Sequence, residues 1–340
     1  MITTCLITCF NYQAFVKEAI LSAVAQTMPF DEIMVIDDAS SDDSPRIIKE
    51  LLGEYSNIVF IQHPENMGQL AALETAIMHS KGDLLFFLDA DDVYAPNYLE
   101  TAVSVYKNNK DCQFLFCRKV DFGRYLPPNL FEINPSAGTN VDVTDLGFSL
   151  VRTFEDKVWI GAPTSCLSIH RRLARRLFPL PVHEDWRTRA DDCIVFGASL
   201  AGCRKFRLEC SLVGYRIHGN NAWANNKRLA DLNVLFVREV SIARLFNLLS
   251  ERFYIDQDIG NIAEFEFKTI PAPSFYDLRW YSRYVMRTKA KPTSRIVAIG
   301  VLVKWYLRSK FGVSLGSEYA GSGMKNGVQD AARLRSRMKP

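Results

Sequence analysis

Over the first 120 residues, continuous apolar runs alternate with segments whose apolar residues recur at helical spacing. Runs of this length, rich in β-branched and aromatic residues, predict buried strands at 3–10, 32–37, 57–62, 83–89 and 112–120. Helical spacing predicts helices at 12–27, 44–55, 68–82 and 95–109. Strands that alternate with helices indicate an α/β fold, with a mostly parallel, Rossmann-like sheet and helices on both faces.

The pattern after residue 120 is less regular. Residues 121–145 are rich in Pro, Gly and Asn and predict a long loop or insertion. Further elements are expected as a helix at 146–154, a strand and a basic helix within 163–178, a helix at 191–202, a strand pair or bent strand at 203–219, and a long amphipathic helix at 228–253. Beyond about residue 270 the pattern weakens, and the composition of 314–327 is typical of flexible chain. We therefore expect two halves of one domain, 1–120 and 121–225, and a helical C-terminal extension, 226–340.

Charge is distributed unevenly along the 340 residues, although the net charge is only +3. Residues 268–340 contain 15 Lys and Arg against 3 Asp and Glu, which leaves 26 against 35 for residues 1–267. The body is thus acidic and the tail basic. A basic tail indicates contact with an anionic surface, such as membrane headgroups or nucleic acid, or a solvated extension.

The 8 cysteines contain no CxxC pair, and most lie in apolar segments. They are expected to be small buried residues in a reducing compartment. The N-terminus lacks the positive region and cleavage site of a signal peptide. No apolar run reaches the roughly 18 residues that span a bilayer. We therefore expect a cytoplasmic protein.

Polar clusters follow three of the predicted strands, as "TCFN" at 8–11, "DDAS" at 37–40 and "DADD" at 89–92. Ligands bind outside the carboxyl ends of parallel strands, so these clusters predict one site. Neither GxGxxG nor GxxxxGK[ST] is present to cradle a phosphate. The carboxylates of 89–92 could instead hold Mg²⁺ or Mn²⁺, which bridges carboxylates to substrate phosphates. The simpler alternative is that each cluster only begins a loop.

The consecutive motifs "ITCFNYQAFVKEAILSAVAQT", "DEIMVIDDASSDDS", "HPENMGQLAALETAI" and "GDLLFFLDADDVYAPNYLE" resemble family 2 glycosyltransferases of the GT-A fold. The resemblance covers residues 1–120 well and 145–225 in part. It implies an inverting transfer of a sugar from a nucleotide-diphosphate sugar, most often UDP-linked, to a glycan or lipid-linked acceptor. Bacterial cell-surface polysaccharide assembly is the setting that the family suggests.

The resemblance also assigns roles to residues of the first half. Phe10, with Thr8, lines a nucleobase pocket, and Asp38 accepts a hydrogen bond from the base. Asp91 is the metal ligand, and Asp89 contacts the ribose or the metal. The implied donor-binding residues are Thr8, Phe10, Asn11, Asp37, Asp38, Asn66, Gly68, Asp89 and Ala90. One departure is that Ala72-Leu73-Glu74 stands where the family often has Ala-Arg-Asn, which removes the usual cation near the diphosphate.

An inverting transfer needs a carboxylate base for the acceptor hydroxyl. The resemblance places Asp191 on the catalytic aspartate, with Asp192 second and Asp185 third. An aspartate at a helix start could also be only an N-cap. In "YRIHGNN" at 215–221, His218 is expected near the metal or the diphosphate. The predicted metal ligands are thus Asp91, Asp89 and His218.

The tail mixes Trp and Tyr with Lys and Arg, a composition suited to a membrane surface. We expect peripheral contact with the inner face of the membrane, and a solvated extension or an oligomer contact stays an open alternative. Nucleic acid is not expected as a partner.

Two other functions stay open: a non-catalytic nucleotide- or glycan-binding module, and a sugar nucleotidyltransferase, which would need a glycine-rich, Arg-containing loop that 8–15 lacks.

Overall fold

The computed structural model describes residues 1–132, 142–219, 231–255 and 260–311. Contacts divide the chain into a first unit, Met1–Pro271, and a second unit, Ala272–Pro340. The segment 314–327, predicted to be flexible, lies outside the described residues. The boundaries expected at 120 and 225 stay predictions.

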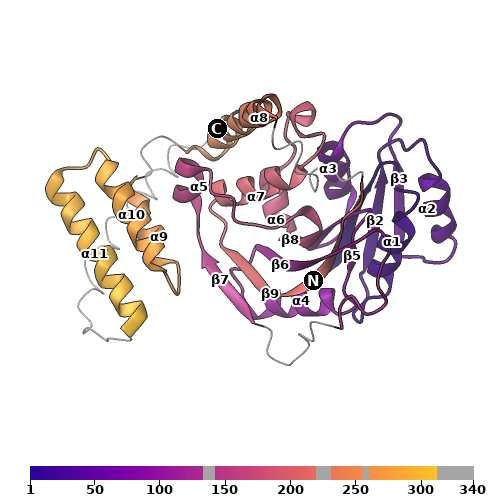
Figure 1. The fold of residues 1–340 in the computed structure, drawn as a ribbon, viewed down its shortest axis with the longest axis horizontal. Coiled ribbons are helices and arrows are strands. Elements are labelled where there is room, and N and C mark those ends of the chain that lie inside the picture. Colours follow the sequence, from indigo (N-terminus) through magenta and orange to yellow (C-terminus); the bar gives the residue numbers. More distant parts are fainter. Residues whose placement is uncertain (133–141, 220–230, 256–259, 312–340) are drawn as a thin grey trace, which may run out of the picture. The chain divides into compact units, whose positions relative to one another are not determined.

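The first unit is built on one 9-stranded sheet with the order β3-β2-β1-β4-β8-β6-β9-β5, in which β7 also pairs with β9 (Figure 1). The strands are β1 (Thr3–Cys9), β2 (Glu32–Asp37), β3 (Ile58–Gln62), β4 (Leu84–Asp89), β5 (Val93–Tyr94), β6 (Phe114–Phe122), β7 (Val143–Gly147), β8 (Leu167–His170) and β9 (Lys205–Arg216).

The predicted strand–helix alternation is confirmed in the first half. Strands β1 to β4 are mutually parallel where they pair. Their helices are α1 (Val16–Val24), α2 (Ser44–Leu52), α3 (Gln69–His79) and α4 (Tyr98–Asn108). Figure 1 shows α2 and α3 on opposite sides of these strands. Because β2 and β4 flank β1 on either side, the connections reverse direction between β1 and β4. Ligands bind at such a switch point.

The second half makes the sheet mixed rather than mostly parallel. Strand β8 lies between β4 and β6 and is antiparallel to both. Strand β9 is parallel to β6, while β5 and β7 pair with β9 antiparallel. Apolar periodicity indicates which residues are buried but not the direction in which a strand runs, so the antiparallel direction of β8 could not be predicted from the sequence.

Two local predictions need correction. Residues 143–145 were expected in a loop and 146–147 at the start of a helix, but Val143–Gly147 forms β7, whose pairing with β9 compensates for weak strand propensity. Of the two alternatives for 203–219, the strand pair is wrong, because Lys205–Arg216 is one strand, β9, and its register with β6 shifts on either side of Arg118, which fits a bent strand. That shift lets a long strand follow the twist of the sheet.

Five helices follow in the described part of the first unit: α5 (Leu150–Asp156), α6 (Arg171–Leu177), α7 (Ala190–Leu200), α8 (Leu232–Phe253) and α9 (Ala263–Lys268). Every residue of α7 is buried, and its neighbours include α3, α5, α6 and α8. The cysteines are all free, and of the 8 only Cys210 is not fully buried. This burial agrees with the expectation that they are core residues.

The second unit contains α10 (Phe275–Arg287) and α11 (Pro292–Phe311), which pack against each other as a hairpin. Side chains of Leu278, Tyr281 and Leu302 are buried. Among the described residues, no helix has the length and apolar character needed to cross a membrane.

Candidate functional site

A cavity of about 590 Å³ opens at the carboxyl ends of β1 and β4, where the connections reverse. Thr8 on β1 pairs in register with Asp89 on β4, so the polar ends of the two strands lie side by side. Of the predicted site residues, 8 line this cavity: Thr8, Phe10, Asp38, Asn66, Gly68, Asp89, Asp91 and Asp191. The fold thus gathers residues from separate motifs, as the strand-end rule predicts.

The turn after β4 is stabilised by hydrogen bonds from a buried arginine, Arg216. Arg216 donates from its Nε to the carbonyl oxygen of Asp91 at 2.6 Å, and from its backbone N–H to Asp92 Oδ1 at 2.9 Å. Ser165 donates from Oγ to Asp92 Oδ2 at 2.6 Å. Asp92 therefore anchors the turn and does not line the cavity, while Asp89 and Asp91 do.

The carboxylates at this turn crowd one another. Burial, followed by the charges of Asp91 and Asp191, raises the pKa of Asp89 to about 8. Burial and the charges of Asp91 and Asp89 also raise the pKa of Asp92 well above its ordinary value. Negative charge concentrated in this way is relieved by a cation.

Within the described part of the chain, no group of three or more His, Cys, Asp and Glu side chains is arranged to hold a metal ion by itself. Two carboxylates that could act as oxygen ligands, those of Asp89 and Asp91, are nevertheless present on the cavity wall. Mg²⁺ is commonly held by one or two carboxylates together with substrate phosphates. The donor set therefore fits a divalent cation that binds together with a diphosphate.

His218 lies behind Asp91, just beyond β9. Its Nε2 is 3.0 Å from Asp91 Oδ2, and its ring centroid is 5.0 Å from that of Phe15. The sequence placed His218 near the metal or the diphosphate, and the structure places it beside Asp91, the predicted metal ligand. Its role as a ligand stays a prediction.

Asp38, at the carboxyl end of β2, organises the turn that contains Gly68. Its Oδ2 accepts from the Gly68 N–H at 2.7 Å, and its Oδ1 accepts from the Met67 N–H at 2.9 Å. Nδ1 of His63 lies 2.7 Å from the same Oδ1. The carboxylate lines the cavity but is already engaged with protein groups.

Three other predicted donor-site residues do not line the cavity. Asp37 is fully buried, and its Oδ1 has no hydrogen-bond partner among the described residues. Asn11 has a φ of 58°, and its Oδ1 accepts from the Ser41 N–H at 2.8 Å, which fixes the loop after β2. Ala90 is buried within the turn. Their roles toward a ligand stay predictions.

Gly68 occupies a backbone conformation that L side chains rarely adopt, with a φ of 91° and a ψ of 165°. A Cβ at this position would lie 2.8 Å from the Cα of Arg187. We expect Gly68→Ala to lower the free energy of unfolding by about 1–3 kcal/mol and to weaken ligand binding, because the 187–189 loop must move. Gly123→Ala, which meets no atom within 4 Å, is the matched control for thermal denaturation. Equal stability of the two variants would contradict the predicted close approach.

The start of α7 provides the carboxylates predicted as a base. Asp191 lines the cavity, and burial together with the Asp192 charge raises its pKa to about 6. Asp192 points elsewhere, because Arg189 donates to both of its oxygens at 2.9 Å. Asp185 accepts from Arg244 Nη1 at 2.9 Å and does not line the cavity. The geometry favours Asp191 among the three candidates.

Cations that the motif reading missed also line the cavity: Lys119, Arg187 and Arg189. Arg187 donates from Nη2 to the carbonyl oxygen of Asn66 at 2.9 Å. It comes from a loop more than 100 residues after the helix where the family often has Ala-Arg-Asn. Positive charge is therefore present near the Asn66 turn, although it arrives from a different segment. In the sequence, Arg187 could have been found only from the segment "HEDWRTR" at 183–189, which contains two arginines just before the acidic pair Asp191-Asp192.

Gln69 connects the two sides of the site. Its Nε2 donates to Asp89 Oδ1 at 2.9 Å, and its Oε1 accepts from the Ala190 N–H at 3.1 Å. One side chain thus joins the carboxylate turn after β4 to the first turn of α7, which contains Asp191. We infer that Gln69 sets the separation of the two carboxylate groups.

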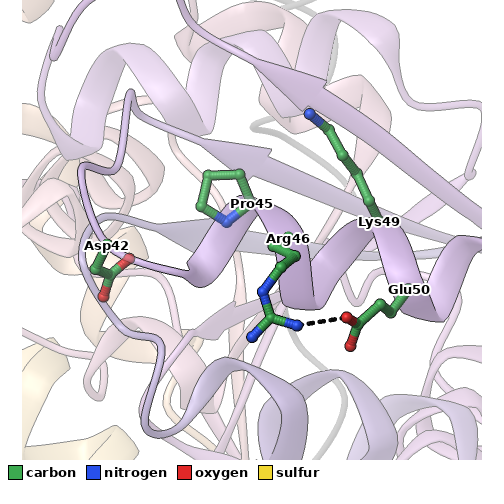
Figure 2. A pocket seen from close by; sticks show the side chains of 5 residues that line it. All are labelled: Asp42, Pro45, Arg46, Lys49 and Glu50. Atoms are coloured by element: carbon green, nitrogen blue, oxygen red, sulfur yellow. Dashed lines mark hydrogen bonds and ion pairs between the residues drawn. The ribbon is translucent and has the colours of Figure 1, made fainter.

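A second depression lies on α2 and is lined by Asp42, Pro45, Arg46, Lys49 and Glu50 (Figure 2). Arg46, which lines this depression, is already paired with carboxylates at α2: its Nη1 lies 2.5 Å from Glu50 Oε1, and its Nη2 lies 3.1 Å from Asp43 Oδ2. Exposed pairs of this kind are ordinary surface contacts. We therefore place the candidate site in the cavity at β1 and β4.

Sequence comparisons find relatives of this chain. Residues 4–178 match the model of the glycosyl transferase family 2. An uncharacterized glycosyltransferase from Nostoc sp. is 30% identical over 217 residues, which are 64% of this chain and 65% of that protein. A poly(ribitol-phosphate) beta-glucosyltransferase from Bacillus spizizenii is 33% identical over 140 residues, 40% of this chain and 22% of that protein. The chain thus matches less than two thirds of the length of these relatives.

Solved structures show the same fold. S. aureus TarS 1–349 in complex with UDP-GlcNAc superposes with a TM-score of 0.52 at 16% identity, covering 94% of this chain and 93% of that one. The mannosyltransferase PcManGT from Pyrobaculum calidifontis, in complex with GDP-Man and Mn²⁺, gives 0.50 at 17% identity and covers 91% and 87%. These likenesses support the GT-A fold expected from the motifs. With the family match over more than half of its residues, the chain belongs to glycosyl transferase family 2.

Proposed function

We propose that this chain transfers a sugar, with inversion and with a divalent cation, from a nucleotide-diphosphate sugar to a glycan or lipid-linked acceptor. The observation that supports this most directly is that Asp89 and Asp91 share one cavity with Asp191. Asp191 is near enough for its charge to raise the pKa of Asp89. The carboxylates proposed to hold the cation and its diphosphate, Asp89 and Asp91, thus line the same cavity as the proposed base, Asp191.

The nucleotide would enter over β1. Phe10 is 42% exposed at the rim of the cavity, so its ring is available to stack on a base. UDP is the proposed nucleotide, in line with the family resemblance and with the UDP-GlcNAc complex of TarS. Arg187, Arg189 and Lys119 supply positive charge on the cavity wall for the diphosphate.

Asp89 and Asp91 would hold the cation, proposed as Mn²⁺ or Mg²⁺, and the PcManGT complex with Mn²⁺ supports this choice. When bound, such an ion neutralises charge that develops on a departing diphosphate. The protein's own contribution is to keep the turn rigid. Arg216 binds the Asp91 carbonyl oxygen, and Gln69 binds Asp89.

Asp191 is the proposed general base. Its carboxylate would take the proton of the acceptor hydroxyl as that oxygen attacks the anomeric carbon and the bond to the diphosphate breaks. Attack from the face opposite the leaving group inverts the configuration. Gln69, by binding both Asp89 and Ala190, helps to keep this base at a fixed separation from the carboxylate turn.

A thermal-shift screen of nucleotide sugars, with and without Mn²⁺, tests donor binding. We expect one nucleotide class to raise the Tm, because a ligand that binds only the folded state stabilises it by RT ln(1 + [L]/Kd). The shift should need Mn²⁺. No shift with any nucleotide sugar would contradict the donor-site proposal.

The pH dependence of transfer follows from Asp191. The base acts only when deprotonated, and its pKa of about 6 lies above the ordinary aspartate value. We therefore expect kcat/KM at saturating Mn²⁺ to fall as the pH drops below about 6, rather than below about 4 as for an unperturbed aspartate. A steady-state profile between pH 4.5 and 8 measures this. A profile that stays flat down to pH 4.5 would argue against Asp191.

A further inference from the structure

The second unit exposes an apolar stripe along α11. Ile296, Val303, Leu307 and Phe311 are 69%, 37%, 46% and 72% exposed. Their spacing of seven, four and four residues puts them on one face of the helix. Leu302, about a third of a turn away from Val303, is completely buried. The stripe is therefore a separate surface and not part of the hairpin core.

The same unit is strongly basic. Residues 272–311 contain nine Lys and Arg and a single acidic residue, Asp277. Asp277 forms a capping box with Ser274 at the start of α10, where it accepts from the Ser274 N–H at 2.8 Å. Arg279, Arg283 and Arg287 recur every four residues on α10, and all three are exposed. On α11, Lys304 and Arg308 each follow a residue of the apolar stripe.

Exposed apolar side chains beside cations are typical of a helix that lies in the interface of a membrane. Anionic headgroups attract each nearby cation, and apolar side chains enter the headgroup–acyl boundary. Two alternative occupants fit less well. A second copy of the unit would bring two strongly positive surfaces together. Nucleic acid would use the cations but has no need of an apolar stripe.

We propose that the α10–α11 hairpin binds the surface of anionic phospholipid membranes, with Ile296, Val303, Leu307 and Phe311 inserted below the headgroups. This inference concerns the second unit alone and does not depend on the proposed transfer reaction. If both hold, the enzyme works at the surface where a lipid-linked acceptor is presented. Membrane binding is measured without substrates, so its failure and that of the transfer proposal are distinguishable.

Co-sedimentation of the full chain with vesicles tests the proposal. We expect binding to vesicles of equal parts phosphatidylglycerol and phosphatidylcholine, and little binding to phosphatidylcholine alone. The double variant Leu307→Ser, Phe311→Ser should bind the anionic vesicles at least about ten-fold more weakly, because two apolar side chains no longer insert. The double variant Lys304→Gln, Arg308→Gln should lose roughly five-fold per cation, and the loss should shrink at high salt.

The matched control is Met78→Ser with Phe236→Ser, which removes two side chains that are 65% and 71% exposed in the first unit. It should bind the vesicles like the unchanged protein. Failure to bind anionic vesicles at low salt would overturn the proposal, as would equal binding by the stripe variant and the control. A stripe variant that keeps vesicle binding but changes from dimer to monomer would assign the surface to a second copy. Binding of duplex DNA that the Lys304→Gln, Arg308→Gln variant loses, without vesicle binding, would overturn the proposal and assign the basic surface to nucleic acid.

Discussion

Replacing Asp191 with Asn is expected to lower the rate of sugar transfer by at least about 100-fold while leaving donor affinity unchanged. The substitution keeps the shape of the side chain and removes the carboxylate that we propose takes the proton of the acceptor hydroxyl. Asp191 lines the cavity at the first turn of α7, whereas the side on which we propose that the nucleotide binds is built from β1 and β4. Donor affinity is measured by calorimetry with UDP and Mn²⁺, and transfer by release of the nucleoside diphosphate.

Two neighbouring aspartates serve as controls for this experiment. Asp185→Asn should retain most activity, because Asp185 binds Arg244 and Ser241 outside the cavity. Asp192→Asn should lower the Tm, because the buried carboxylate that pairs with Arg189 is lost. Full transfer activity in Asp191→Asn, with loss in one of these variants instead, would move the base to that residue.

Replacing Asp91 with Ala is expected to weaken Mn²⁺-dependent binding of UDP by at least about 100-fold, since even outer-shell changes cost 10–100-fold in metal affinity. The turn itself should survive, because Arg216 contacts the Asp91 carbonyl oxygen and the Asp92 carboxylate rather than the Asp91 side chain. Calorimetric titration of UDP, with and without Mn²⁺, gives the affinities. The unchanged protein should bind UDP much more weakly when the metal is absent.

Asp83→Ala is the matched control for Asp91→Ala, because Asp83 precedes the amino end of β4, whereas the cavity lies at the carboxyl end. It should leave UDP binding unaltered. If the unchanged protein bound UDP equally well with and without Mn²⁺, the metal assignment of Asp91 would be wrong.

The parts of the fold that the sequence revealed are those with strong local signals. Buried strands such as β2 and β4 are continuous apolar runs, and they end at the carboxylates that the strand-end rule selected. Strand β7 was missed because four of its five residues are only half-buried and its stability comes from pairing with β9. The antiparallel direction of β8 depends on how the chain returns to the sheet, which a local pattern does not encode.

The same distinction applies to the site. Asp89, Asp91 and Asp191 could be selected because each stands in a motif. Arg187 was missed, because its contact with Asn66 joins two segments that lie more than 100 residues apart in the sequence. The dual role of Gln69 was also hidden, because both of its partners, Asp89 and Ala190, are brought to it only by folding.

The most direct test is nucleoside diphosphate release from a panel of UDP-, GDP- and dTDP-sugars, measured with the unchanged protein, Asp91→Ala and Asp191→Asn. We predict that one donor gives release by the unchanged protein, that the release needs Mn²⁺ or Mg²⁺, and that both variants lose it. Binding of a donor without release of its nucleotide would indicate a non-catalytic module. Release that is equal in all three proteins would contradict the placement of sugar transfer in the cavity at β1 and β4.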